Sequence, residues 1–308
     1  MGFYPGRAEA HNGVLSIDEV LADPTVISDR IADIAGQDLL VEKVFSQDNA
    51  PVSGGTVIYS KTTQKHLYTS NDVADRQPGD EYPVVYSDRP ELEIARVEDF
   101  GGKFAVSDEA RRRNLNIDFD NDVTRLANTV TRKLNQRAIE TIEAAEESGE
   151  TINYAAAFDT RAWWDVKLEG NPADITPATD RPTAAISMMF QEAQETELGI
   201  NYTHILMSPW QYAGAQAVYG DKLAPTFEQF GLEPVISNNI NQDKMYLVDQ
   251  GKAGFIKYEM PLTVETWRDH AHRQDWIQAF AMPVMGITLP AAIAVIDFSN
   301  SPYYQQGA

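Results

Sequence analysis

Two short stretches of the 308-residue chain place carboxylates or imidazoles at spacings that metal sites use. The first, DFDND at 118–122, begins like a calcium-binding loop, with oxygen ligands at alternate positions. Such a loop needs glycine at its sixth position and glutamate at its twelfth, where this chain has Val123 and Thr129. Asp120 or Asp122 suits a helix cap instead, because a carboxylate accepts the free backbone N–H groups of a first turn.

The second stretch is His270-Ala271-His272, which follows Asp269. Two imidazoles on one side of a strand can bind zinc, but an isolated His-x-His is more often a pair of surface or hydrogen-bonded histidines. We therefore expect no metal there. His204 precedes an apolar strand and is expected to be structural.

Catalytic motifs are missing from the sequence. GxGxxG, GxxxxGK[ST], GxSxG and HExxH do not occur, so nucleotide binding, serine hydrolysis and zinc proteolysis lack their usual spacing. The chain has no cysteine, which excludes disulfides, thiol catalysis and thiolate metal sites. We expect no catalytic residue, no cofactor and no metal.

Charge and hydropathy narrow the function classes further. The 46 acidic residues against 25 Lys and Arg give a net charge of −21, which disfavours tight binding of nucleic acid. The first residues carry no basic and apolar secretion signal, so we expect synthesis in a cytoplasm. The apolar run at 276–296 is interrupted by Pro283, Gly286 and Pro290, which favours buried strands over a membrane span.

A long amphipathic helix should organise the chain. Apolar residues recur at steps of three or four, as Leu126, Val130, Leu134, Ala138, Ile142 and Ala145. The spacing predicts a helix over about 120–148, roughly 40 Å long, with Gly149 closing its end in a left-handed conformation. Shorter elements are expected to lie across it.

The chain before this helix lacks a core of its own. Residues 1–49 read as an arm with two short amphipathic helices that must dock on this subunit or on a neighbour. Residues 50–99 hold β-rich runs at 56–63 and 84–100 around a polar stretch, which predicts a long two-stranded loop with an irregular tip. An isolated two-stranded ribbon is marginal in water, so it must lean on a partner.

The chain after the helix reads as a compact α+β region with a mixed sheet flanked by helices. Trp163 and Trp164 are expected to be core or interface anchors. The predicted helices are 183–198 and 209–220, and the predicted strands are 203–208, 234–237, 245–249, 253–258 and 262–267.

This order of parts resembles the major capsid protein of tailed bacteriophages, the Hong Kong 97 type of shell subunit. The matching stretches are FAVSDEARRR at 104–113, ILMSPWQYAGAQ at 205–216 and the closing segment 272–296, and the resemblance covers about residues 40–298. It implies a fold with five parts. These are an N-terminal arm (1–49), an extended β-hairpin loop (50–99), a peripheral domain with the long spine helix (100–180 and 262–298), an axial α+β domain (181–261) and a C-terminal tail (299–308).

The resemblance also implies function and partners. The chain would self-assemble through pentamers and hexamers into an icosahedral shell in the bacterial cytoplasm, and would remain in the virion. The shell would hold double-stranded DNA without binding it tightly, which agrees with the net charge of −21. A portal would complete it, with or without a decoration protein. The 49-residue arm leaves no room for a scaffolding segment, so a separate scaffolding protein is expected.

Two sets of residues are candidates for contacts between subunits. The compact basic cluster Arg111, Arg112 and Arg113 could meet the acidic loop of a neighbour, which carries Asp72, Asp75, Asp80 and Glu81. By resemblance, the loop lysines Lys61 and Lys65 are candidates for a covalent cross-link to an asparagine. Neither lies in an identifying motif, so ordinary solvated lysines are the expectation.

Three alternatives remain open from the sequence. An encapsulin-type nanocompartment shares the fold and would show a groove for a cargo peptide. A tail or decoration protein would lack the spine helix and the two-domain order. An acidic cytosolic hydrolase with paired carboxylates would form a small oligomer rather than a large particle.

Overall fold

The computed structural model describes residues 40–299, apart from residues 53, 78, 80, 91, 113–115 and 155–160. The helices expected within residues 1–39, and the tail from residue 300 on, lie outside the described residues. The α-helices are α3 (Val41–Val44), α4 (Asp108–Arg112), α5 (Asn116–Glu147), α6 (Pro182–Glu195), α7 (Pro209–Tyr219) and α8 (Leu223–Phe230). The strands are β1 (Phe45–Gln47), β2 (Thr56–Ser60), β3 (Leu92–Arg96), β4 (Phe100–Ser107), β5 (Ile152–Tyr154), β6 (His204–Met207), β7 (Glu233–Ile236), β8 (Lys244–Val248), β9 (Gly254–Asp269), β10 (Gln274–Ile287) and β11 (Ile293–Asp297). Short 3₁₀ helices are η1 (Gln64–His66), η2 (Trp163–Asp165), η3 (Ala178–Asp180), η4 (Gly220–Lys222) and η5 (Pro290–Ala292).

Helix α5 confirms the predicted long helix and is longer than expected. Its 32 residues correspond to roughly 48 Å. It begins at Asn116, so the predicted cap at Asp120 or Asp122 is wrong, and Asp122 instead pairs with Arg125 at 3.2 Å. Gly149 closes the helix with φ at 72°, as predicted. The buried stripe is Val123, Ala127, Val130, Leu134, Ala138, Ile142 and Ala145.

A four-stranded sheet in the order β1-β9-β10-β4 packs against α5. The two strands predicted at 253–258 and 262–267 are one strand, β9, although Pro261 stands in its middle. The register of β9 against β10 shifts between Phe280 and Met282, opposite this proline. Proline has no N–H to donate, and a bulge is where a strand can accept it without losing a ladder hydrogen bond.

A five-stranded mixed sheet in the order β5-β11-β8-β6-β7 separates two cores. Alternate residues point to opposite faces of a strand, so each central strand serves both cores. On one face Leu206, Tyr246 and Val295 join the core of α5. On the other face Ile205, Leu247 and Ile296 join the core of α6, α7 and α8. Burial on both faces explains why these strands read as continuous apolar runs.

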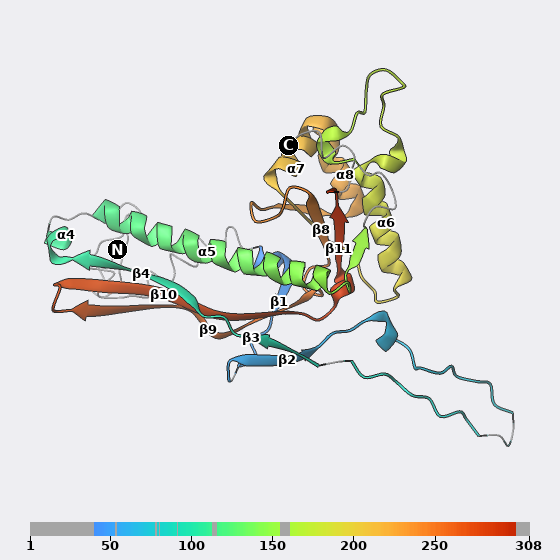
Figure 1. Cartoon of the computed structure of the whole chain (residues 1–308), viewed down its shortest axis with the longest axis horizontal. Coiled ribbons are helices and arrows are strands. Elements are labelled where there is room, and N and C mark those ends of the chain that lie inside the picture. The colour runs from blue at the N-terminus through green and yellow to red at the C-terminus, as the bar shows by residue number, and fades with distance from the viewer. Residues whose placement is uncertain are drawn as a thin grey trace, which may run out of the picture.

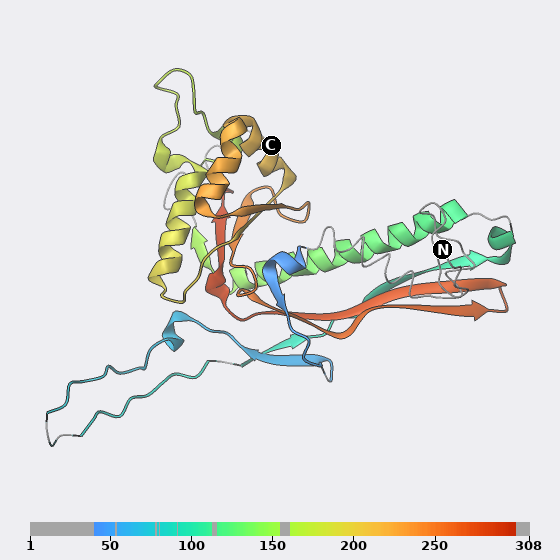
Figure 2. The same cartoon turned by 180° about the vertical axis from the view of Figure 1, so that it is seen from behind.

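The molecule is elongated (Figure 1). Helix α5 runs along the β9–β10 hairpin, and the five-stranded sheet with its helices stands at the end where α5 finishes. The β2–β3 ribbon lies on the other side of the hairpin from α5 and continues into a long loop, as the reverse view also shows (Figure 2). Strand β11 comes from the segment expected in the peripheral domain, yet it pairs with β8 from the expected axial domain as well as with β5. The boundaries between these domains therefore stay predictions. Across the described ranges, no helix combines the length and apolar character needed to cross a bilayer.

Candidate assembly surfaces

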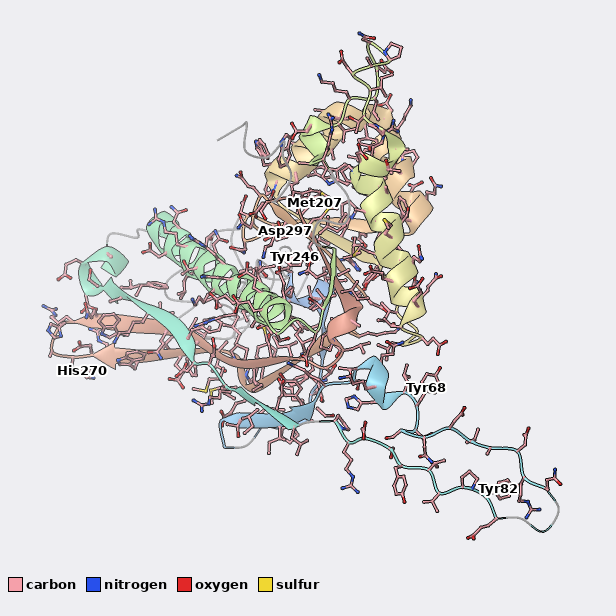
Figure 3. All side chains as sticks on the ribbon, turned by 45° about the vertical axis from the view of Figure 1, so that its right-hand side comes forward. Tyr68, Tyr82, Met207, Tyr246, His270 and Asp297 are labelled. Carbon is pink, nitrogen blue, oxygen red and sulfur yellow. The ribbon has the colours of Figure 1, made fainter. Side chains whose placement is uncertain are left out.

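The loop that joins β2 to β3, residues 61–91, projects away from the body and is called the projecting loop (Figure 1). Its described apolar side chains face solvent: Val73 is 75% exposed and Tyr82 is 67% exposed. Tyr68 lies near the body, whereas Tyr82 lies far out on the loop (Figure 3). The complete set of large exposed apolar residues here is Leu67, Tyr68, Val73, Tyr82, Val84, Val85 and Tyr86. Such a run is a candidate contact surface, because soluble monomers seldom expose contiguous apolar patches.

The two limbs of the projecting loop are joined by hydrogen bonds although no strand is assigned to them. The Asn71 side chain donates to the Val84 carbonyl at 2.7 Å and accepts from the Tyr86 N–H at 2.9 Å. The Ser70 N–H donates to the Tyr86 carbonyl at 2.6 Å. The two limbs are therefore paired where Ser70 and Asn71 lie opposite Val84 and Tyr86.

The β2–β3 ribbon adds an apolar face of its own. Ile58 and Ile94 stand directly opposite each other in the register and are 65% and 64% exposed. Leu92, their diagonal neighbour, is 74% exposed. On the other face Tyr59 packs edge-on against Phe255, with ring centroids 5.4 Å apart. One face of the ribbon is thus seated on the body, and the outer face stays open.

An ion-pair network holds the base of the projecting loop. Lys61 Nζ lies 2.6 Å from Glu93 and 2.8 Å from Glu150, which follows α5. Burial disfavours the charge on Lys61, but hydrogen bonds to Glu150 and Glu93 outweigh it and raise the pKa of the amine. Burial and a 2.8 Å hydrogen bond to Glu93 raise the pKa of Tyr59 to about 12. Of the two cross-link candidates, Lys61 is therefore occupied within its own subunit, whereas Lys65 is exposed on η1.

The first limb of the projecting loop also touches the end of α6. The Gln64 side chain donates to the Glu195 carbonyl at 3.5 Å, and the Tyr68 hydroxyl donates to Glu197. The Thr62 N–H donates to the Thr288 carbonyl at 2.7 Å. No sequence pattern indicates Glu150 or Glu197, because each lies about 90 or more residues from its partner and belongs to no motif.

The described acidic residues of the predicted contact lie far from helix α4, which carries part of the basic cluster (Figure 1). Asp72, Asp75 and Glu81 are exposed on the projecting loop, and Asp80 lies outside the described residues. Arg111 and Arg112 end α4 with side chains that are not described, and Arg113 lies outside the described residues. Helix α4 and the outer part of the loop lie at opposite ends of the molecule (Figure 1). Pairing between the two sets requires a second subunit.

A groove between α5 and β4 has an apolar floor and a basic rim. Phe100, Leu126 and Val130 line it together with Arg132 and Lys133, around a volume of about 380 Å³. Glycines 101 and 102 also line it, and a Cβ at residue 102 would come within 2.8 Å of Leu126. Gly102 therefore lets α5 approach β4 closely, whereas a Cβ at residue 101 would meet Ala279 and Phe280 of β10.

A wider polar cleft of about 760 Å³ separates α5 from the start of α7. Trp210 is 47% exposed on its wall and packs on Trp164, with ring centroids 3.7 Å apart. Trp163 is fully buried between Tyr219 and Phe227. Trp163 is therefore a core anchor, one of the two predicted roles, and Trp164 is a half-buried contact for Trp210.

The histidines singled out from the sequence, His204, His270 and His272, lie in two separate places. Strand β9 ends at Asp269, so the two imidazoles of His270 and His272 lie in the turn that follows it and not on one side of a strand. Asp269 pairs with His272 at 2.7 Å, which holds the pKa of the carboxyl at about 2. His204 is 4% exposed, and burial lowers its pKa, as suits a structural histidine. Among the residues that the structure describes, no group of three or more histidine or acidic side chains is placed to hold a metal ion.

Comparisons with known proteins agree with this arrangement. A sequence model of the family described as phage capsid protein matches residues 91–296. No curated protein sequence matches the chain. The solved capsid of the cyanophage P-SCSP1u aligns with a TM-score of 0.58 at 10% identity, over 98% of this chain and 93% of that one.

Two further solved structures show the same fold. The structure titled Microbacterium phage Oxtober96 aligns with a TM-score of 0.58 at 12% identity, over 84% of this chain and 91% of that one. A virus-like particle from Pyrococcus furiosus aligns with a TM-score of 0.55 at 12% identity, over 88% of this chain and 98% of that one. The α+β capsid fold expected from the sequence is therefore confirmed.

Proposed function

The chain belongs to the phage capsid protein family, and from that premise we propose that it is the major capsid protein of a tailed bacteriophage. It forms the icosahedral shell around a double-stranded DNA genome. The observation that carries this proposal is the projecting loop with its ribbon, whose apolar side chains, such as Tyr82 and Ile94, find no cover in the described part of the chain. Family and fold indicate a structural protein rather than an enzyme.

Assembly joins unlike surfaces of neighbouring subunits. The projecting loop of one subunit lies against the groove between α5 and β4 of the next, where apolar residues meet Phe100 and Leu126. Its exposed carboxylates Asp72, Asp75 and Glu81, with Asp80, face the basic clusters of the neighbour at Arg132 and Arg111–Arg113. Repetition of this contact closes pentamers and hexamers into a shell.

The partners follow from the shell. A separate scaffolding protein guides assembly in the bacterial cytoplasm, and a portal completes the virion, with or without a decoration protein. The net charge of −21 keeps the inner wall from binding packaged DNA tightly. The two loop lysines form no cross-link, because Lys61 is held by Glu93 and Glu150 and Lys65 lies in no reactive cluster among the described residues. Denaturing gels of the shells should then show a single band near 34.3 kDa.

Negative-stain microscopy of the purified chain tests the proposal, with closed particles as the expected result. A variant in which residues 71–85 are replaced by Asn-Gly should fold and form none, because Ser70 and Tyr86 already pair across the limbs and can close a short hairpin. Normal shells from this variant would overturn the role of the loop. A small defined oligomer from the parent chain would favour an acidic hydrolase instead.

A second candidate is the shell of a storage compartment. It is favoured by the alignment over 98% of the virus-like particle chain from Pyrococcus furiosus. The contents of particles isolated from the native source decide between the two. DNA inside supports the capsid, whereas protein cargo without DNA supports the compartment.

A further inference from the structure

Glu197 has a backbone conformation that its residue type does not favour. Its φ is 57°, in the left-handed region, and Arg273 is the other non-glycine residue with positive φ among those described. Glycine adopts this region without the crowding of a Cβ and is the usual residue where a helix ends this way. Glu197 lies two residues after the last residue of α6. A strained residue of this kind is a reason to look for a role.

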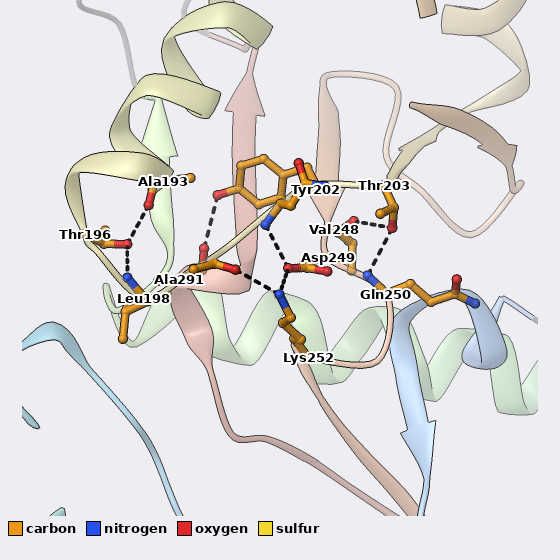
Figure 4. Close-up of polar contacts among 12 residues, drawn as sticks. Ala193, Thr196, Leu198, Tyr202, Thr203, Val248, Asp249, Gln250, Lys252 and Ala291 are labelled. Carbon is orange, nitrogen blue, oxygen red and sulfur yellow. Dashed lines mark hydrogen bonds and ion pairs between the residues drawn. The ribbon is translucent and has the colours of Figure 1, made fainter. Parts of the chain in front are cut away.

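The turn that contains Glu197 is pinned on both sides (Figure 4). The Thr196 hydroxyl donates to the Ala193 carbonyl at 2.7 Å and accepts from the Leu198 N–H at 3.4 Å. Beyond it, Lys252 Nζ donates to the Gly199 carbonyl at 2.8 Å and pairs with Asp249 at 3.0 Å. The position of Glu197 is therefore set by the body and not by the loop that it touches.

The side chain of Glu197 accepts the hydrogen bond from the Tyr68 hydroxyl of the projecting loop. This bond raises the pKa of Tyr68. A glycine at residue 197 would suit the backbone and would leave Tyr68 without this acceptor. The glutamate thus supplies a contact to the loop at a position where the helix end alone would favour glycine.

A second carboxylate holds the same limb at its root. Glu150, which follows the left-handed Gly149 at the end of α5, pairs with Lys61 at 2.8 Å. The Lys61 side chain is only 15% exposed, so solvent screens this pair less than it screens the exposed contact of Tyr68. The two contacts lie seven positions apart on one limb and join it to two different parts of the body.

We propose that Glu150 and Glu197 are positioning residues that fix the direction of the projecting loop within the subunit before assembly. The inference deepens the proposed shell function and rests on it for its biological meaning. Pre-orientation matters there because a loop that is already aimed loses less conformational freedom on docking to a neighbour.

The test measures the direction of the loop in the full chain. The protein has no cysteine, so Val73→Cys on the loop and Ser187→Cys on α6 introduce the only two sites for spin labels. Labelled chain is diluted with excess unlabelled chain, so that the measured distance lies within one subunit in any state of assembly. The parent should give one narrow distance distribution.

Glu197→Gly combined with Glu150→Gln should broaden this distribution, and each single change should broaden it less. Tyr68→Phe removes one hydroxyl from the loop and leaves the body unaltered, so it should reproduce the effect of Glu197→Gly even if that variant folds poorly. Glu197→Gln retains an oxygen that can accept from Tyr68 and should restore the parent distribution. An unchanged narrow distribution in Tyr68→Phe and in the double variant would overturn the proposal.

Arg273→Gly is the matched control, since Arg273 is the other described non-glycine residue with positive φ and lies between β9 and β10, where it pairs with Asp108. It should leave the distance distribution unchanged. Glu197→Gly should melt at or slightly above the parent temperature, because it relieves backbone strain, whereas a residue that only supports the fold would melt lower. Failure of the proposed function would appear as absent shells in the parent chain, which leaves the distance measurement intact.

Discussion

The five-stranded sheet and the β2–β3 ribbon use the same kinds of side chain with opposite results. In β8, Met245, Tyr246, Leu247 and Val248 are all fully buried. In the ribbon, Ile58 and Ile94 are cross-strand partners and each is nearly two-thirds exposed. β-Branched and aromatic residues favour a strand in both places, but only the sheet has a layer on each face. The ribbon therefore has an apolar face that no other described part of the subunit covers.

The largest expected effect lies in the sheet. Leu247→Ala removes a fully buried side chain beside α6 and should lower the free energy of unfolding by about 2–5 kcal/mol. Urea unfolding of the unassembled subunit measures it. A loss under about 1 kcal/mol would mean that this core is loosely packed, and the contrast with the ribbon would fail.

The ribbon should respond in the opposite way. Ile58→Ser with Ile94→Ser should change the stability of the unassembled subunit by no more than about 0.5 kcal/mol, because both side chains already face water. Shell yield should fall strongly, since the covering subunit loses its apolar contact. Particle counts by microscopy and unfolding curves, measured on the same preparation, separate the two effects. Unaltered yield would show that this face stays open in the shell.

Acid should weaken the contacts that hold the β2–β3 ribbon on the body before it unfolds the five-stranded sheet. Burial opposes ionisation of Glu93, but hydrogen bonds from Lys61 and Tyr59 outweigh it and lower its pKa below 4.5. Because its pKa is lower in the folded state, ionised Glu93 stabilises the contact with Lys61 and Tyr59 above about pH 4.5. This stabilisation is lost as the pH falls through the folded-state pKa. Because solvent screens this partly exposed carboxylate, it contributes about 1 kcal/mol or less to the free energy of unfolding.

Hydrogen exchange at the Thr62 N–H, which donates to Thr288, reports this change. Its protection, corrected for the intrinsic pH dependence of exchange, should decline below about pH 4.5 in the parent. In Glu93→Gln it should be lower at neutral pH and nearly independent of pH. The same acid decline in both proteins would assign the effect to another group.

The smallest expected effect on the subunit comes from the basic cluster. Arg112→Glu with Arg113→Glu should leave its melting almost unchanged, because exposed ion pairs contribute only about 0–1 kcal/mol. Shell yield should fall, because every copy in a shell repeats the contact. Parent shells should weaken as salt rises above about 0.1 M, where the screening length is about 10 Å. Normal assembly of the variant at low salt would show that the cluster is a solvated face.

Local pattern was enough to predict the elements that carry a clear period. The stripe from Leu126 to Ala145 predicted α5, and Pro209 before an apolar run predicted the start of α7. The strands at 204–207 and 244–248 were found because burial on both faces leaves an unbroken apolar run. The extended character of the loop was predicted from its polar stretch between two β-rich runs, whereas the seven exposed apolar side chains on it became evident only in the structure.

Tertiary contacts set the features that were missed. Pro261 reads as a strand end, yet the bulge opposite Phe280 and Met282 lets β9 run through it. Nothing near Lys61 indicates Glu150, because the contact depends on how the ribbon seats against the end of α5. The left-handed conformation of Glu197 could not be predicted either, because glycine is the residue that usually indicates such a position at a helix end.

The five-stranded sheet that separates two cores also governs how the protein melts. Leu206 belongs to one core and its neighbours Ile205 and Met207 to the other, so β6 cannot leave one core and remain in the second. Partial unfolding of either side would expose apolar surface on both. The described body should therefore unfold on heating in one cooperative transition. The projecting loop lies outside both cores and should contribute little to the heat absorbed.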